Sequence, residues 1–284
     1  MNRVIRELFN LNLMKTIKSI LLLFFTAILL FSCAKVPLTG RRQLSLVSDE
    51  SLNKEALTAY QNFLNEPKTK VIKGTSEAQR VKAVGAKLAR VIDAYLKQNR
   101  FGDQYNFQWE FNLIESKDVN AWCMPGGKVA VYTGILPVTK DETGLATVIG
   151  HEIAHAIARH SAERYSHVLA AQTGGGILGV VTGNASEATQ KTVSQLYGIG
   201  GQLALLKYSR NQESEADRLG LIFMSMAGYQ PEKAIDFWER MSAAKKGDGA
   251  PPEFLSTHPS DETRIAEIKK RLPEANKYFR PSAN

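Results

Sequence analysis

Residues 151–155 combine side chains that hold a metal ion with one that can move a proton. They read His-Glu-Ile-Ala-His, and residues four apart on a helix lie one turn apart on the same face. His151 and His155 can therefore bind one tetrahedral Zn²⁺ ion together. Glu152 would lie beside the ion, where it can take a proton from a water molecule held there. The pattern predicts hydrolysis at a site with one zinc ion per chain.

The sequence around this motif predicts a buried helix. Apart from the motif and Thr147, every side chain between 145 and 158 is apolar or small, and a helix that is apolar all round is a buried one. Burying two imidazoles and a carboxylate without partners costs free energy, and a bound metal ion removes that cost. The alternative is a pair of hydrogen-bonded core histidines, but it leaves Glu152 as an unexplained buried charge.

A catalytic zinc site needs a third protein ligand and an open fourth position. The metzincin pattern would require glycine at 158 and histidine at 161, whereas this chain has Ala158 and Ser161. We therefore expect a carboxylate ligand, and a predicted helix over residues 210–227 can supply it. One stripe of that helix is mostly apolar or small and should face inward; it comprises Glu213, Ala216, Asp217, Gly220, Phe223, Met224 and Ala227.

The two acids on this stripe receive different roles. Glu213 is the predicted third ligand, and Asp217, one turn further on, is the predicted acceptor for the ring N–H of a ligand histidine. Gly220 would let this helix approach the metal helix closely. A solvated, acidic start of a helix is the alternative, since the burial of this face is inferred from the pattern.

The composition is that of a globular protein with one or two domains. The chain has 284 residues, of which 44% are hydrophobic, and a formal net charge of +8. No basic run interleaved with aromatic residues points to a nucleic acid, and a weak attraction to an anionic membrane surface is the simpler reading of the charge. Of the two cysteines, Cys33 and Cys123, Cys33 has a better use at the end of the N-terminal apolar segment, so we expect neither a structural disulfide nor a cysteine-rich metal site.

The first 32 residues have the pattern of a secretory signal, and either Met1 or Met14 is its first residue. Two lysines precede an apolar run over residues 20–31, and Ser32 precedes Cys33. Because this junction resembles a bacterial lipobox, Cys33 is the predicted lipidation site. An uncleaved anchor or an ordinary signal with an incidental cysteine are the alternatives. The expected location is the periplasmic side of a bacterial cell envelope, at the outer membrane, with membrane contact through the N-terminal lipid.

The remaining chain divides into a tether over 33–48, one domain over 49–272 and a polar tail over 273–284. Hydrophobic periodicity and capping residues predict further helices at 49–65, from residue 76, at 231–244 and at 260–272, and strands at 107–113, 120–124 and 128–132.

The strand at 120–124 is a candidate substrate site because it would lie next to the metal helix. An edge strand offers unpaired N–H and C=O groups to an extended peptide. A closed hairpin without a ligand is the alternative, and the strand pattern alone favours it.

Two features between the metal-site helices have no assigned role. His160 lies off the metal face of a continuous helix, so we expect it at the surface or at a helix cap. The apolar run in the Gly-rich segment at 173–201 is too short, and the segment contains too much glycine, to predict a membrane-spanning helix. A flexible segment near the mouth of the active site and plain disorder are equal alternatives.

The chain resembles the zinc metallopeptidase family that contains the type I CAAX prenyl protease, the mitochondrial Oma-type peptidase and bacterial periplasmic lipoprotein peptidases. The resemblance covers residues 36–272 and rests on separate motifs in the same order. The matching segments are Pro37-Leu38-Thr39-Gly40-Arg41-Arg42-Gln43-Leu44, Asn120-Ala121-Trp122 with Pro125-Gly126-Gly127, His151-Glu152-x-x-His155, Glu213-x-x-Ala216-Asp217 and Thr257-His258-Pro259.

The resemblance implies an α+β fold, mostly helical, of the zincin-like gluzincin type, with a small sheet whose edge strand lies beside the metal helix. It implies Glu213 as third ligand, Asp217 as its supporting acid and His258 as a group that stabilises the oxyanion. Residue spacing alone gives His258 no role, and without the resemblance a surface position would be favoured.

The resemblance also implies that Asn120, Ala121 and Trp122 bind the substrate. The membrane-spanning helices of the integral-membrane members are missing from this sequence. This difference favours the lipid-tethered branch of the family over processing of prenylated proteins.

The expected function is that of a zinc metalloendopeptidase acting on unfolded or misassembled envelope proteins. The main alternative is an envelope chaperone or assembly-factor lipoprotein with a latent or regulatory zinc site, working with the envelope assembly machinery. A non-proteolytic zinc hydrolase is a second alternative. Latency is a third, with the Gly-rich segment or a side chain such as His167 blocking the open metal position.

Overall fold

The structure, a computed structural model, describes residues 33–173, 208–245, 253–258 and 263–281. The expected signal peptide and nearly all of the Gly-rich segment lie outside the described residues. The described elements are β1 Cys33–Lys35, β2 Arg42–Leu44, α2 Asp49–Asn65, β3 Val71–Ile72, α3 Ser76–Gln98, η1 Gly102–Gln104, β4 Glu110–Ile114, β5 Ala121–Met124, β6 Lys128–Tyr132, η2 Thr133–Ile135, α4 Leu136–Thr139, α5 Glu142–Ile157, α6 His160–Thr173, α9 Arg210–Met226, α10 Lys233–Lys245, α11 Phe254–Thr257 and α12 Thr263–Asn276.

A four-stranded mixed sheet forms the middle layer, with the strand order β3-β4-β6-β5. β4 and β6 are parallel, and the other neighbours are antiparallel. The turn between β5 and β6 contains Gly126 and Gly127 at φ +79° and +86°, a conformation that glycine adopts without steric cost. In the strand order given, β5 is the last strand and lies at an edge of the sheet.

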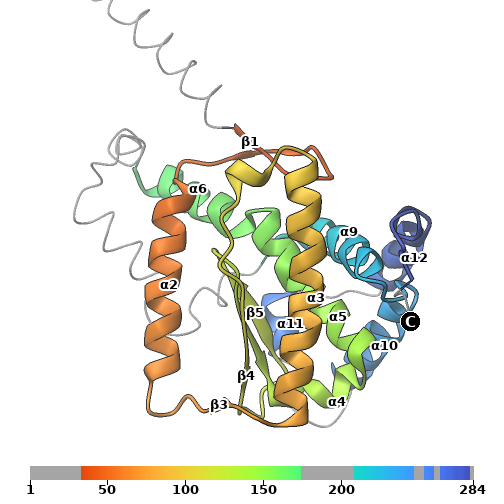
Figure 1. Cartoon of the computed structure of the whole chain (residues 1–284). Coiled ribbons are helices and arrows are strands. Elements are labelled where there is room, and N and C mark those ends of the chain that lie inside the picture. Colours follow the sequence, from red (N-terminus) through yellow and green to blue (C-terminus); the bar gives the residue numbers. More distant parts are fainter. Residues whose placement is uncertain (1–32, 174–207, 246–252, 259–262, 282–284) are drawn as a thin grey trace, which may run out of the picture.

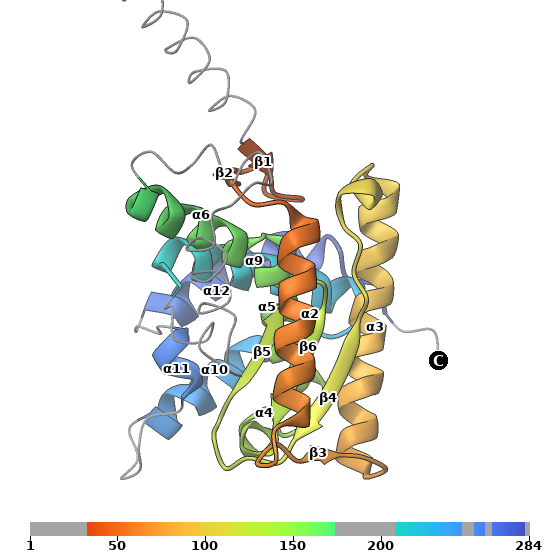
Figure 2. The same ribbon diagram turned by 90° about the vertical axis from the view of Figure 1, so that its left-hand side faces the viewer.

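Helices cover both faces of this sheet. α2 packs on one face, where Tyr60 and Phe63 contact Trp122, and α3 and α5 pack on the other face (Figures 1 and 2). The alternation of side chains along β5 explains both contacts, because Trp122 and its neighbours Ala121 and Cys123 belong to different hydrophobic clusters.

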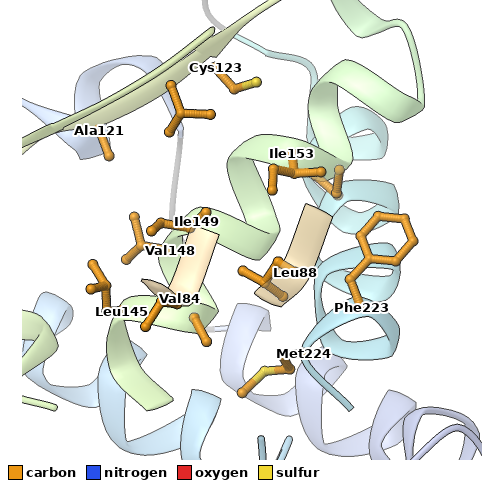
Figure 3. Packing of buried hydrophobic residues seen from close by; sticks show 14 of the residues in the cluster. Val84, Leu88, Ala121, Cys123, Leu145, Val148, Ile149, Ile153, Phe223 and Met224 are labelled. Atoms are coloured by element: carbon orange, nitrogen blue, oxygen red, sulfur yellow. The ribbon is translucent and has the colours of Figure 1, made fainter. Parts of the chain in front are cut away.

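α5 is the central helix of the larger cluster. Asp141 caps its start by accepting a hydrogen bond from Gly144 N at 2.8 Å. Apolar side chains of α5 point toward α3, α9 and the sheet at once (Figure 3). Thirteen of its 16 residues are buried, which is why the sequence is apolar all round.

α9 crosses α5 at a contact between two glycines. A Cβ atom placed on Gly220 would lie 3.1 Å from the backbone N of His151, and one on Gly150 would lie 3.3 Å from the backbone O of Gly220. The prediction that Gly220 permits a close approach to the metal helix is confirmed.

The predicted fold class is confirmed: the chain is mostly helical, with a small sheet whose edge strand contacts the metal helix. Predicted and observed bounds agree for α2 and β6. β4 begins at Glu110, later than the alternation from residue 107 implies, because its partner β6 begins at Lys128 and Gln108 N donates instead to Gly126 O in the turn before β6. α12 continues to Asn276, into the segment expected to be a tail.

The segment at 33–48 forms a two-stranded hairpin, β1–β2, that packs on the domain. Leu46 N donates a hydrogen bond to Ser166 Oγ of α6 at 2.9 Å, and Arg159 Nη2 donates one to Ser45 Oγ at 3.0 Å. The expected tether thus has specific contacts with α6. None of the helices in the described ranges has both the length and the apolar character to cross a membrane.

The glycine contact generates a prediction about stability. Gly220→Ala places a methyl group against the backbone of α5, so the helices must separate, and we expect a loss of about 1–3 kcal/mol in the free energy of unfolding. Gly102→Ala is the control, because its Cβ would meet Lys97 Cα at an ordinary 3.5 Å. Urea unfolding of both variants tests this, and equal stability of the two would contradict the close contact.

Candidate metal centre

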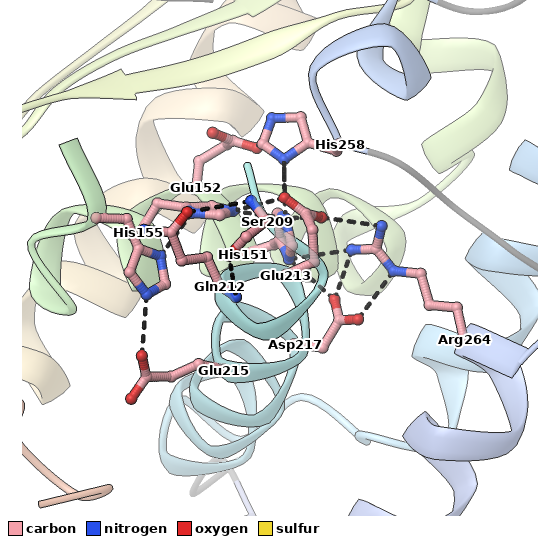
Figure 4. Close-up of polar contacts among 11 residues, drawn as sticks. His151, Glu152, His155, Ser209, Gln212, Glu213, Glu215, Asp217, His258 and Arg264 are labelled. Atoms are coloured by element: carbon pink, nitrogen blue, oxygen red, sulfur yellow. Dashed lines mark hydrogen bonds and ion pairs between the residues drawn. The ribbon is translucent and has the colours of Figure 1, made fainter. Parts of the chain in front are cut away.

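Four buried side chains from three segments converge on one point (Figure 4). His151 and His155 come from α5, Glu213 comes from α9, and His258 follows α11. One donor atom of each lies within 4.8 Å of the other three. The predicted ligands His151, His155 and Glu213 are therefore brought together, although 58 residues separate the second histidine from the acid.

The separations between these donors fit a tetrahedral zinc site. His151 Nε2 lies 3.1 Å from His155 Nε2 and 3.2 Å from His258 Nδ1, and His155 Nε2 lies 3.4 Å from Glu213 Oε1. Zinc–ligand bonds of about 2.0–2.1 Å place neighbouring tetrahedral donors roughly 3.3 Å apart. Glu213 Oε2 also makes no hydrogen bond within the described part of the chain, although Arg264 Nη1 is 3.1 Å away.

The outer nitrogen of the His151 ring contacts the predicted supporting acid. His151 Nδ1 lies 2.9 Å from Asp217 Oδ1, and Arg264 donates to the same carboxylate through Nε at 2.8 Å and Nη2 at 2.7 Å. Since a carboxylate only accepts, Nδ1 of His151 carries a proton and donates it. The lone pair of Nε2 is then left for a metal ion.

The outer nitrogen of the His155 ring contacts another histidine. His155 Nδ1 lies 2.8 Å from His160 Nδ1, and His160 Nε2 lies 3.0 Å from Glu215 Oε2. The expectation that His160 is a surface or capping residue is wrong, because its exposure is 0%. α5 ends before Arg159, whose φ of +54° turns the chain so that His160 faces back toward His155.

Charge pairing adjusts the protonation of the donors. Burial raises the pKa of Glu213, but His258, His151 and His155 hold it well below its usual value, so this donor is an anion. Burial lowers the pKa of His155 well below its usual value. Burial also lowers that of His151, yet hydrogen bonds to Asp217 and Glu213 raise this pKa to about 9. A proton and a metal ion therefore compete for His151, and metal binding releases the proton.

Glu152 is placed beside the donors and not among them (Figure 4). Its exposure is 2%, and its Oε1 atom makes no hydrogen bond within the described ranges. His258 Nε2 lies 3.4 Å from that oxygen. Burial raises the pKa of Glu152, although His258 and His151 act against the rise. A buried carboxylate with an unused lone pair can act as a general base.

His258 lies at the fourth corner of the cluster. Besides its contact with His151, its Nδ1 lies 3.0 Å from Glu213 Oε1. Phe254 stacks on its ring at a centroid distance of 4.4 Å. This places His258 among the possible metal donors, closer to the centre than a group expected only to stabilise an oxyanion. His167, considered as a blocking group, is exposed on α6.

Two further residues at the site were missed by the sequence reasoning. Tyr208 stacks on His155 with ring centroids 3.7 Å apart, and the pattern around it gives no signal for this. Arg264 contacts Asp217 and Glu213. A signal for it exists, because Arg264 shares a buried helical face with Ile268, and a charge on such a face needs a partner.

The predicted substrate residues lie at the start of β5, which pairs with β6 alone in the described sheet. The side chain of Trp122 packs under α2, and Asn120 Oδ1 accepts a hydrogen bond from Ala121 N at 2.9 Å. The side chain of Trp122 is therefore unavailable to a substrate, and its backbone groups face β6. Cys33 begins β1, and its lipidation stays a prediction.

Comparison with known proteins identifies relatives of this site. The sequence profile of Peptidase family M48 matches residues 76–272. The mitochondrial metalloendopeptidase OMA1 of Schizosaccharomyces pombe is 35% identical over 241 residues, 84% of this chain and 66% of that protein. Metalloendopeptidase OMA1, mitochondrial, of Homo sapiens is 30% identical over 246 residues, covering 85% and 46%. The beta-barrel assembly-enhancing protease of Yersinia pestis is 29% identical over 167 residues, covering 57% and 34%.

These comparisons correct the expected location. The relatives that align with 84–85% of this chain are named as mitochondrial, whereas the bacterial protein aligns with 57%. A lipid-anchored protein on the periplasmic side of a bacterial envelope is thus contradicted. The expected location rested only on the first 32 residues and the Ser32–Cys33 junction, and an uncleaved anchor fits the same short pattern.

The family relationship agrees with the site. The matched region contains the complete four-donor cluster, and the predicted enzyme class and zinc cofactor agree with a family of metallopeptidases. The chain spans between about a third and two thirds of the length of the relatives described above. With 69% of its residues inside the matched range, this chain belongs to peptidase family M48.

Proposed function

We propose that this protein is a zinc metalloendopeptidase that hydrolyses peptide bonds within extended, unfolded polypeptide. The observation that carries the proposal is the position of Glu152. Its buried carboxylate lies next to the donor cluster, with one oxygen free of hydrogen bonds in the described part of the chain. A site that only stabilised the fold would have no use for a buried acid whose Oε1 accepts no hydrogen bond from the described residues.

The residues divide the chemical work between them. His151, His155 and Glu213 would hold the zinc ion, which supplies Lewis acidity when bound. Glu152 Oε1 takes the proton of the attacking water and later passes it to the nitrogen of the leaving amine. Because the cluster is buried, bulk water is kept away while these transfers occur.

The edge strand β5 supports an extended substrate. Tyr132 N donates to Asn120 O at 3.0 Å, which shows that every second residue from Asn120 directs its backbone groups toward β6. Backbone groups alternate in direction along a strand, so those of Ala121 and Cys123 face away from β6. Ala121 N donates to Asn120 Oδ1, so a peptide that pairs at this residue would displace that amide oxygen. Such a peptide would be held through its backbone, with little dependence on its side chains.

His258 has to leave the fourth corner before a substrate can react there. Its Nδ1 lies 3.2 Å from His151 Nε2, so the imidazole would take the position that a catalytic zinc site keeps open. We assign it the role of a closing donor. After the His258 imidazole has moved away from this position, it could stabilise the oxyanion, which is the role implied by the resemblance.

The same observation favours a second candidate, a chaperone or assembly factor with a latent or structural zinc ion. Structural zinc sites have four protein ligands, and His258 completes such a set. This candidate leaves the burial of Glu152 unexplained, so it ranks below the peptidase.

The role of Glu152 can be tested by Glu152→Gln. The amide cannot take a proton, so we expect zinc to be retained while cleavage of casein falls by at least about a hundredfold. Zinc content and casein cleavage are measured on the same sample. Glu142→Gln, at the exposed start of the same helix, is the control and should cleave normally. Normal cleavage of casein by Glu152→Gln would contradict the proposed function. If the variant loses cleavage but still has the effect of the wild-type protein in cells, the chaperone is favoured.

The role of His258 can be tested by His258→Ala. Removing the fourth donor opens that position to solvent, so casein cleavage per bound zinc should rise. His167→Ala removes an exposed histidine and should leave the rate unchanged. A fall in the rate at full zinc occupancy would show that His258 acts mainly on the oxyanion.

A further inference from the structure

A chain of hydrogen bonds connects the metal-facing ring of His155 to the N-terminal hairpin β1–β2. We propose that His160 is a positioning residue for the metal centre, fixed by Glu215, which Arg41 and Thr39 of the hairpin hold in place. The proposal extends the proposed function, because it makes the N-terminal segment a working part of the zinc site.

The carboxylate of Glu215, at one end of this series of hydrogen bonds, determines which ring nitrogens carry a proton. Glu215 is a carboxylate and only accepts, so His160 Nε2, 3.0 Å from its Oε2, must donate. Nδ1 of the neutral His160 ring is then an acceptor. His155 Nδ1, 2.8 Å away, therefore donates to it. The lone pair of the His155 ring is left on Nε2, the atom that faces the other donors.

His155 is consequently connected to α9 on the outer side of its ring, and a bound zinc ion would connect it to α9 on the inner side as well. On the inner side, His155 Nε2 lies 3.4 Å from Glu213 Oε1. On the outer side, His160 links its Nδ1 to Glu215. Glu213 and Glu215 are two positions apart and so point in nearly opposite directions from the helix. The ring is thus fixed in orientation as well as in position.

The local backbone is built to bring His160 to this place. Arg159 adopts φ +54°, a conformation that costs a non-glycine residue free energy. Its guanidinium is anchored to Ser45 Oγ at 3.0 Å and to Asp49 Oδ1 at 2.5 Å. These contacts hold the turn between α5 and α6 and keep His160 buried beneath His155.

The hairpin β1–β2 supplies the residues at the other end of this series of hydrogen bonds. Thr39 Oγ1 donates to Glu215 Oε1 at 2.6 Å, and Arg41 Nε donates to Glu215 Oε2 at 2.7 Å. Arg41 also reaches Glu163 of α6 through Nη1 at 2.6 Å, and Gln212 of α9 donates to Glu163 at 2.9 Å. The guanidinium therefore lies between two carboxylates and connects the hairpin to both helices.

Three substitutions of His160 separate positioning from packing. Asn places its amide oxygen where Nδ1 of histidine lies, so His160→Asn keeps an acceptor for His155. Gln places its amide nitrogen where Nε2 lies, so His160→Gln keeps only the bond to Glu215. Leu keeps the volume without either bond. If His160 acted only by filling space, Asn, the smallest of the three, would be the most damaging.

We expect the opposite order for zinc affinity. His160→Gln and His160→Leu should bind zinc roughly ten- to a hundredfold more weakly than the wild type, and His160→Asn within about threefold of it. Affinity is measured by competition with a chelating dye, and the visible spectrum of the Co²⁺-loaded protein reports on the donor geometry. Thermal unfolding of each variant in a chelator shows whether a loss of affinity is merely a loss of folding.

The contribution of the hairpin is tested by a matched pair of arginines. Arg41, whose side chain is 34% exposed, contacts Glu215, whereas its neighbour Arg42 is exposed on the same hairpin. Arg41→Gln should weaken zinc binding by about threefold, less than His160→Leu, because it acts through two intervening side chains. Arg42→Gln should bind zinc as the wild type does.

The outcomes separate this proposal from the proposed function. Wild-type zinc affinity in folded His160→Leu and His160→Gln, or equal affinity of the two arginine variants, would overturn it. Because zinc affinity is measured without a substrate, failure of the wild type to cleave casein would remove the peptidase and leave this test intact. If His160→Leu does not fold, Arg41→Gln against Arg42→Gln still decides.

Discussion

The structure depends on two imidazole nitrogens that face each other across 3.1 Å and share one position for positive charge. Asp217 and His160 each require the outer nitrogen of a ligand ring to donate, so the lone pairs that remain for a metal ion are those on Nε2 of His151 and of His155. Two such lone pairs repel unless a proton or a metal ion lies between them. Glu213 adds a carboxylate to the same point. The core is therefore arranged around a position for positive charge, and α5 and α9 must be close enough to share it.

The fold meets this requirement by anchoring each ring from a different direction. The Asp217 contact of His151 is supported from α12 by Arg264, whose guanidinium also lies 3.4 Å above the ring of Trp238. The His160 contact of His155 is supported from the N-terminal hairpin by Arg41. Two arginines from opposite ends of the chain thus hold the two acids that orient the ligands. This explains why a site centred on one helix needs most of the sequence to be built.

Sequence patterns predicted what depends on local periodicity. The buried metal helix follows from its uniformly apolar sequence, and the start of α2 follows from its N-cap residue. The choice of Glu213 over Glu215 follows from the face of the helix that each residue occupies. The position of His160 was predicted wrongly because the helical-face rule assumes a continuous helix. The helix ends before Arg159, which has a positive φ although it is not a glycine, so the sequence contains no sign of the turn. The fourth corner, reached by His258, depends on tertiary packing and has no local signal.

The position of His258 is not independent of the candidate substrate strand. α11 has four residues, too few to be stable alone, so its neighbours determine where His258 lies. Phe254 stacks on the His258 ring, and its N–H donates to Val119 O at 3.0 Å. Val119 lies two residues before Ala121, so its carbonyl faces the same open side of β5. The closing donor and the edge that would hold a peptide are therefore parts of one hydrogen-bonded unit.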